Sequence, residues 1–160
     1  MNRRPKLTLM LGNSHSGKST WVEKNKGDAC VVCPDTIRKL IFGHQFHRPA
    51  EEHVWALTKS MVTILLHQGK SVILDATNLR YEVRRPYWDI AKEFGARTEI
   101  VWVRTPVLQC LKRNRTDKVK AIPPQVVANM DVMLEEPSKE EVDKIRMIWY
   151  GKPVRKSRKE

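Results

Sequence analysis

The 160-residue sequence contains no long apolar segment and only three cysteines. A membrane-spanning helix needs about 20 consecutive apolar residues, and no run in this chain approaches that length. Residues 1–6 lead straight into a short strand-like run, so we expect no signal peptide. So few cysteines are typical of a reducing compartment. We therefore expect a cytoplasmic, intracellular protein that makes no contact with a membrane.

Two of the cysteines, Cys30 and Cys33, form a C-x-x-C pair of the kind that binds zinc in other proteins. A structural zinc site needs four ligands, and the sequence holds no second pair and no His-x-His partner. The valines between the two cysteines read as part of a buried strand. We therefore interpret both cysteines as core or strand-end residues and expect no zinc site.

Acidic residues are scarce relative to basic ones. The chain has 30 Lys and Arg residues against 18 Asp and Glu, which gives a net charge of +12 and a pI of about 9.9. Such a positive field favours a polyanionic partner, nucleic acid before a membrane surface, although a merely soluble basic protein is the alternative. Residues 112–120 carry five cations and one acid, and residues 151–160 carry five cations. We expect 151–160 to be a flexible basic tail.

Apolar runs alternate with helical patterns along the chain, an order that is typical of a parallel α/β sheet. We expect one domain over residues 1–150, with four or five parallel strands flanked by helices. The predicted strands are 7–11, 29–32, 71–75, 98–103 and 145–149. The predicted helices are 19–25, 35–42, 49–68, 83–94, 106–114 and one that begins at Pro123 or Pro124.

Two of the predicted helices carry specific expectations. In the helix over 49–68, periodicity predicts a single apolar face, which consists of Val54, Leu57, Met61, Ile64 and Leu65. In the helix over 83–94, we expect Pro86 in the first turn, because a proline deeper in a helix would break it.

Residues 12–20 form a complete G-x-x-x-x-G-K-S sequence between a strand-like run and a helix. The glycines let backbone N–H groups point inward at phosphate oxygens, and the helix adds the positive end of its dipole. Lys18 would reach the β- and γ-phosphates, and the Ser19 hydroxyl would coordinate Mg²⁺. A chance glycine turn is the alternative, but strand, loop and helix are in register. We therefore expect ATP and Mg²⁺ to be bound by Gly12, Asn13, Ser14, His15, Ser16, Gly17, Lys18, Ser19 and Thr20.

In such a fold, functional side chains follow the carboxyl ends of the strands. Asp35 follows the second strand, where it suits a base that accepts a proton from an attacking hydroxyl and equally suits a helix N-cap. Arg38 lies one helical turn later on the same face. Asp75 ends the third strand, a Walker B pattern that brings a carboxylate near Mg²⁺. The cationic segment 112–120 is either a lid over the triphosphate or a solvated loop.

Together these residues resemble the polynucleotide 5′-hydroxyl kinase family of P-loop phosphotransferases. The resemblance covers about residues 6–135 and rests on the glycine-rich loop, Asp35-x-x-Arg38, Asp75-Ala76-Thr77-Asn78-Leu79, Arg84-Arg85, Arg113-Asn114-Arg115 and Lys120-Ala121-Ile122-Pro123. It implies an adenylate-kinase-like fold and transfer of the γ-phosphate of ATP to the 5′-OH end of DNA or RNA. Because no phosphatase-type or ligase-type domain follows within the 160 residues, we expect a stand-alone kinase without an obligatory protein partner.

The resemblance further implies a role for each matching residue. Lys18 would bind the β- and γ-phosphates and Ser19 the Mg²⁺. Asp35 would be the general base, and Arg38 would contact the 3′-phosphate of the acceptor. Asp75 would stand near the metal or the acceptor. Further acceptor contacts are expected from Thr77, Asn78, Arg84 and Arg85.

The lid, about residues 112–123, departs from the family pattern. The family has a second arginine a turn after Arg-Asn, where this chain holds Asp117 or a lysine. Arg115, or else Arg113, would then supply the cation for the transition state, and Arg113 would also bind ATP.

Two other functions fit parts of the sequence. A small-molecule or sugar-nucleotide kinase of the zeta-toxin type shares the loop, Asp-x-x-Arg and lid, but needs no basic surface. A non-catalytic nucleic-acid-binding NTPase would leave Asp35 with no task beyond capping.

Overall fold

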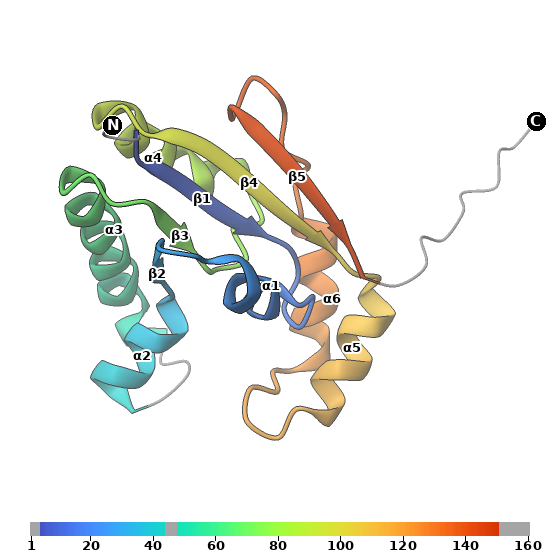
Figure 1. The fold of residues 1–160 in the computed structure, drawn as a ribbon. Coiled ribbons are helices and arrows are strands. Elements are labelled where there is room, and N and C mark those ends of the chain that lie inside the picture. The colour runs from blue at the N-terminus through green and yellow to red at the C-terminus, as the bar shows by residue number, and fades with distance from the viewer. Residues whose placement is uncertain (1–3, 44–47, 151–160) are drawn as a thin grey trace, which may run out of the picture.

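A computed structural model describes residues 4–43 and 48–150 and contains a five-stranded parallel sheet (Figure 1). The strand order is β2-β3-β1-β4-β5. The strands are β1 Lys6–Leu11, β2 Cys30–Val32, β3 Val72–Leu74, β4 Arg97–Arg104 and β5 Lys144–Trp149. The helices are α1 Lys18–Asn25, α2 Pro34–Phe42, the 3₁₀ turn η1 Arg48–Ala50, α3 Glu51–His67, α4 Tyr81–Glu93, α5 Val107–Thr116 and α6 Pro124–Met133. The predicted α/β fold with a parallel sheet and flanking helices is confirmed.

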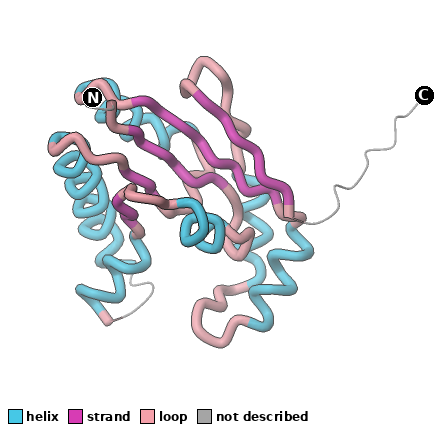
Figure 2. The backbone as a smooth tube through the Cα atoms, in the orientation of Figure 1, coloured by secondary structure: helices cyan, strands magenta, loops and turns pink. Residues whose placement is uncertain are grey.

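All four strand pairings are parallel, so the carboxyl ends of the strands meet at one edge of the sheet. The loop between α5 and α6 lies beyond that edge (Figure 2). Among the described residues, no helix has the length and apolar character that would let it cross a membrane. The predicted basic tail, 151–160, lies outside the described residues.

The central strand β1 is buried on both faces, as its continuous apolar run requires. Alternate side chains of a strand point to opposite faces. Leu9 and its odd-numbered neighbours pack with residues of α3 and α4, whereas Met10 packs with Trp21 and Val22 of α1. The sheet is therefore covered by α1 on one face and by α3 and α4 on the other (Figure 1).

The buried face of α3 differs from the predicted one. The buried residues recur at every fourth position and are Val54, Thr58, Val62 and Leu66. Three residues of the predicted face, Leu57, Met61 and Ile64, are exposed. Because α3 carries apolar residues on more than one side, their spacing alone does not select a face. The core accepts Thr58 because its hydroxyl donates to the carbonyl of Val54 at 2.7 Å.

Helix α4 begins two residues earlier than predicted, and Pro86 is its sixth residue rather than a residue of its first turn. The prediction for Pro86 is therefore wrong. Its ring leaves the carbonyl of Glu82 without the usual helical donor, but Glu82 is exposed, so water can satisfy that carbonyl.

Arg84, the fourth residue of α4, is buried inside the protein. Its side chain is fully buried and paired with Glu141, at 2.6 Å between Nε and Oε1 and 3.0 Å between Nη2 and Oε2. Its Nη1 donates to the carbonyls of Asn78, Leu79 and Glu135. The expectation that Arg84 contacts the acceptor is therefore wrong, because this guanidinium is committed to the fold. Arg85, by contrast, is exposed.

The Arg84–Glu141 pair generates a stability prediction. In Arg84→Met the carboxylate of Glu141 stays buried without its partner, and removing one member of a buried pair costs about 3–5 kcal/mol. We expect that loss in the free energy of unfolding measured by urea titration. Arg85→Met, one residue away and exposed, should stay within about 0.5 kcal/mol of wild type. Equal stabilities for the two variants would contradict the buried assignment.

Candidate active site

The loop over residues 12–17 connects β1 to α1 and depends on glycine at both ends. Gly12 has a φ of 148°, and a Cβ there would lie 2.6 Å from the carbonyl oxygen of Val103. Gly17 has a φ of 104° and precedes the first turn of α1. Both positions exclude other side chains, for steric and conformational reasons. The N–H of Gly12 also donates to the carbonyl of Thr77 at 3.2 Å, which ties the loop to the end of β3.

Lys18 begins α1 and is buried. Its ammonium donates to the carbonyls of Gly12, at 3.0 Å, and Asn13, at 2.6 Å. Burial lowers the pKa of Lys18 to about 8, although the negative charge of Asp75 opposes the shift. The loop therefore holds a desolvated ammonium whose positive charge an anion would stabilise.

Ser19 and Asp75 meet across the ends of α1 and β3. The Ser19 hydroxyl donates to Oδ2 of Asp75 at 2.7 Å. Burial raises the pKa of the Asp75 carboxyl, against the hydrogen bond from Ser19 and the charge of Lys18. A hydroxyl and a carboxylate are the hard oxygen donors that Mg²⁺ prefers, and Mg²⁺ on a phosphate needs only one or two protein ligands. The Ser19–Asp75 pair therefore fits Mg²⁺ on a phosphate. A metal site made by the protein alone is a different case: residues 4–43 and 48–150 contain no cluster of three His, Cys, Asp or Glu that could hold a metal ion.

Asp35 is the second residue of α2 and does not cap that helix. The N-cap position belongs to Cys33, and no side chain caps the helix end. The Asp35 side chain is 56% exposed and pairs through Oδ1 with Nη1 of Arg38. Its second oxygen, Oδ2, makes no hydrogen bond with the described residues. The capping alternative is therefore wrong, and one carboxylate oxygen is anchored while the other is available.

Arg38 is held by a residue that the sequence did not single out. Glu51, at the start of α3, accepts from Nε of Arg38 at 2.6 Å and from Nη2 at 2.8 Å. Burial would lower the pKa of Arg38, but Glu51 and Asp35 outweigh that effect and raise it. A guanidinium has five N–H groups, and three are used here. Two remain for a ligand. A glutamate in the first turn of a helix was the only available signal.

Lys18, Asp35 and Asp75, which follow β1, β2 and β3, are close enough for their charges to shift one another's pKa. Asp75 and Asp35 both act to raise the pKa of Lys18, and Asp35 acts to raise that of Asp75. Asn78 is different. It is 2% exposed, adopts a left-handed φ of 46°, and donates Nδ2 to the carbonyl of Met10 at 2.7 Å. Its amide therefore joins the ends of two strands, which conflicts with the expected contact to the acceptor.

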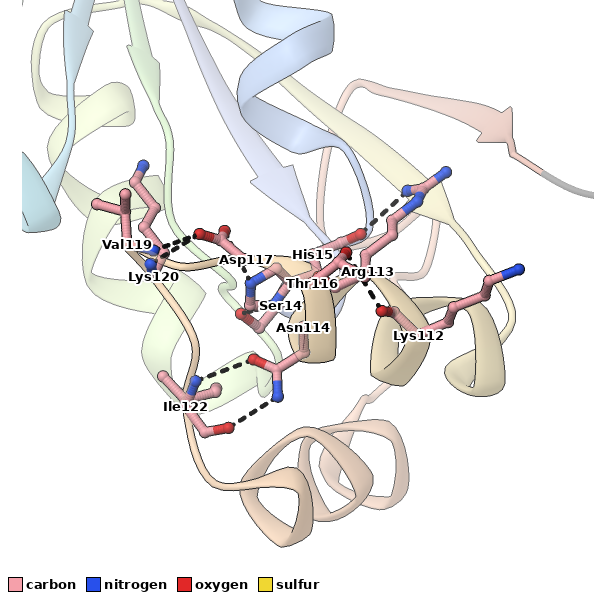
Figure 3. A network of polar contacts seen from close by, with 10 residues as sticks. All are labelled: Ser14, His15, Lys112, Arg113, Asn114, Thr116, Asp117, Val119, Lys120 and Ile122. Atoms are coloured by element: carbon pink, nitrogen blue, oxygen red, sulfur yellow. Dashed lines mark hydrogen bonds and ion pairs between the residues drawn. The ribbon is translucent and has the colours of Figure 1, made fainter.

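The predicted lid consists of the end of α5 and the loop that follows it (Figure 3). Nη1 of Arg113 donates to the carbonyls of His15, at 3.0 Å, and Ser16, at 3.2 Å. Asn114 makes two hydrogen bonds with the backbone of Ile122, at 2.8 and 2.9 Å. Arg115 is exposed and makes no hydrogen bond or ion pair with the described residues. Of the two predicted lid arginines, only Arg113 contacts the phosphate-binding loop.

Comparison with known proteins identifies the family. The sequence model of the AAA_33 family, described as an AAA domain, matches residues 7–137. Among curated proteins, the chain is similar to the L-seryl-tRNA(Sec) kinase of Methanococcus maripaludis, with 27% identity over 139 residues. That match covers 82% of this chain and 53% of the relative, so the chain spans about half the length of the curated protein.

Two solved structures are also similar. A chain of the Pnkp1/Rnl/Hen1 RNA repair complex has 26% identity and a TM-score of 0.66, over 81% of this chain and 44% of that chain. The APS kinase CysC of Mycobacterium tuberculosis, in complex with AMPPNP and APS, shares the fold at 19% identity and a TM-score of 0.61, over 90% of this chain and 88% of that chain. A family match of this extent, over a sheet and a phosphate-binding loop that agree with it, shows that the chain belongs to the AAA_33 family of P-loop kinases.

Proposed function

We propose that this kinase transfers the γ-phosphate of ATP to the 5′-hydroxyl end of a nucleic acid. The observation that carries the proposal is the arrangement of Asp35, Arg38 and Glu51 beside Lys18. Arg38 anchors one oxygen of Asp35 and keeps the other available, and it retains two N–H donors of its own. A base beside a guanidinium with spare donors suits an acceptor that presents a hydroxyl next to a phosphate.

In the proposed reaction, the acceptor hydroxyl gives its proton to Oδ2 of Asp35 as its oxygen bonds to the γ-phosphorus. The bond between that phosphorus and the β,γ-bridging oxygen breaks, and ADP leaves. Lys18 turns from the loop carbonyls to the β- and γ-phosphates. Ser19 and Asp75 would hold Mg²⁺, which when bound neutralises charge on those phosphates. Catalysis then rests on positioning and on fixed charges.

The class of acceptor is argued from charge and from the relatives. A net charge of +12 attracts a polyanion, and a small-molecule kinase has no need of it. The names of two relatives refer to RNA. One is a seryl-tRNA kinase, and the other is a chain of an RNA repair complex. The AMPPNP in the APS kinase complex supports ATP as the donor. The alternative remains a small-molecule or sugar-nucleotide kinase of the zeta-toxin type, which the common fold alone supports.

The proposal is tested with ATP labelled in its γ-phosphate, Mg²⁺ and an oligonucleotide that ends in a 5′-OH. We expect label at the 5′ end, and none on the same oligonucleotide with a 5′-phosphate. Lys18→Ala should lower the rate by orders of magnitude, because it removes a fixed charge from the phosphates. Lys24→Ala, an exposed lysine in the last turn of α1, is the matched control. If the oligonucleotide stays unlabelled while a small nucleotide or sugar takes up the label, the small-molecule kinase is favoured instead.

A second test concerns the base. Asp35→Asn retains an oxygen for Arg38 but cannot accept a proton at neutral pH. Removing a general base lowers the rate by about 10²–10⁴-fold, and we expect that loss in single-turnover transfer with ATP affinity unchanged. Thr36→Ala, the exposed neighbour in α2, should transfer at the wild-type rate. Transfer by Asp35→Asn within a few-fold of wild type would remove Asp35 from the mechanism.

A third test uses pH. Because the pKa of Lys18 is lowered to about 8, the free protein loses this proton above pH 8, whereas phosphates in contact with the ammonium retain it. Binding therefore takes up a proton, and affinity must fall as pH rises. We expect the dissociation constant of ATP with Mg²⁺ to rise roughly tenfold from pH 7 to pH 9. Titration calorimetry at both pH values measures it, and equal constants would show that Lys18 does not titrate in this range.

A further inference from the structure

The lid presents several cations, and the structure separates them by where they lie. Nη1 of Arg113 donates to two carbonyls of the phosphate-binding loop, and these hydrogen bonds hold the side chain against that loop. Arg115 and Lys118 are exposed and make no hydrogen bond or ion pair with the described residues. Lys120 is different, because its backbone belongs to a turn that the protein fixes.

Asp117 organises that turn and joins it to the phosphate-binding loop (Figure 3). Its Oδ1 accepts from the backbone N–H groups of Val119 and Lys120, each at 2.9 Å. Its Oδ2 lies 3.3 Å from Nε2 of His15. One carboxylate oxygen therefore holds the turn, and the other lies at ion-pair distance from a buried imidazole nitrogen that makes no hydrogen bond. The two backbone hydrogen bonds are also the largest reason why the pKa of Asp117 is lowered, so this group is ionised at neutral pH.

His15 is constrained as well. It has a left-handed φ of 60°, a conformation that is uncommon for residues other than glycine. Its Nδ1 lies 3.0 Å from the hydroxyl of Ser14, so both ring nitrogens have a neighbour. Strain of this kind persists where surrounding contacts fix it. The loop thus presents the imidazole of His15 to Asp117 from a backbone geometry that glycine would adopt at lower cost.

The side chain of Lys120 extends from the turn away from α6 and toward the sheet (Figure 3). Its charge reaches Asp75: burial raises the pKa of that carboxyl, and Lys120 is among the groups that lower it. Lys120 is therefore close enough to the Ser19–Asp75 pair for its charge to act on the Asp75 carboxyl. Arg115 is exposed and makes no hydrogen bond or ion pair with the described residues.

We propose that Lys120 is the lid cation that contacts the transferred phosphoryl group, and that Asp117, which lies beside His15, is the residue that positions it. The inference rests on the proposed phosphoryl transfer and assigns to a lysine the task expected of Arg115. The contact between Asp117 and His15 joins the loop proposed to hold the triphosphate to the turn that carries the cation. Placement of Lys120 thus depends on an ordered phosphate-binding loop.

The first experiment compares three lid variants, Lys120→Ala, Lys118→Ala and Arg115→Ala. Transfer to a 5′-OH oligonucleotide gives kcat, and calorimetry gives ATP affinity. Loss of a charge that acts mainly in the transition state lowers kcat by about 10²–10³-fold with little change in ATP affinity. We expect this for Lys120→Ala, partial recovery in Lys120→Arg, and changes below about threefold for the other two. A larger loss in Arg115→Ala, or wild-type kcat in Lys120→Ala, would overturn the proposal.

The second experiment isolates the positioning role of Asp117. Asp117→Ala should lower kcat by about tenfold, and the same change made in Lys120→Ala should lower it no further, since coupled residues are not additive. A purely structural role would give additive losses and would overturn this part of the proposal. His15→Gly, which keeps the left-handed backbone and removes the imidazole, should reproduce the loss seen in Asp117→Ala.

Slow ATP hydrolysis without an acceptor separates this inference from the proposed function. Transfer to water develops the same charge on the phosphoryl group, so the ranking of lid variants should be the same. If the oligonucleotide stays unlabelled but the lid variants keep the same order of hydrolysis rates, the proposed acceptor is wrong and the role of Lys120 is supported. A reversed ranking in hydrolysis would overturn Lys120 whatever the acceptor.

Discussion

The parallel pairing of β1 with β3 on one side and β4 on the other is the constraint on which the site depends. It brings the carboxyl ends of the strands to one edge, so residues distant in sequence become neighbours there. The glycine-rich loop leaves β1 against the Val103 carbonyl of β4, with no room for a Cβ at Gly12. Its other side is bonded to Thr77, beyond the end of β3. The position of Lys18 is thus set by two neighbouring strands rather than by the loop alone.

At that edge of the sheet, each partly or fully desolvated charged group has a hydrogen-bonding partner. Lys18 is buried against loop carbonyls, and Arg38 is buried between Asp35 and Glu51. The half-buried Asp75 accepts a hydrogen bond from Ser19. Unmatched, each would be costly. Each pairing nonetheless leaves some capacity unused: an oxygen of Asp35, two donors of Arg38, and an ammonium whose partners are only neutral carbonyls. In the proposed reaction, this unused capacity is what binds the acceptor and the triphosphate.

The sequence predicted the features that depend on residues close together in the chain. The loop over 12–17 needs glycines within a few residues of each other, and Asp35 and Asp75 follow strands directly, so the sequence indicates all of them. Five strands and six α-helices in the described residues agree with the predicted order. The strand ends therefore predicted where Lys18, Asp35 and Asp75 would meet.

Contacts between distant segments were not predictable in this way. Arg84 and Arg85 read alike in the sequence, because nothing near them signals that Glu141, 57 residues later, pairs with one and buries it. Nothing in the sequence near Glu51 signals that it holds Arg38, 13 residues earlier in the chain. Asp117 was noted only as a departure from a family pattern, and its contact with His15 depends on how α5 packs on the loop. In each case a tertiary partner decided the role of a charged residue.

We propose that this P-loop kinase phosphorylates the 5′ end of a nucleic acid, and competition between three acceptors would distinguish this activity from the others. The wild-type protein would receive labelled ATP and Mg²⁺ with equal concentrations of a 5′-OH oligonucleotide, seryl-tRNA with a 5′-phosphate, and APS, the last two chosen because relatives are named for them. We expect the label to appear first and almost entirely on the 5′ end of the oligonucleotide. Label on the seryl group or on APS, with the oligonucleotide unlabelled, would contradict it.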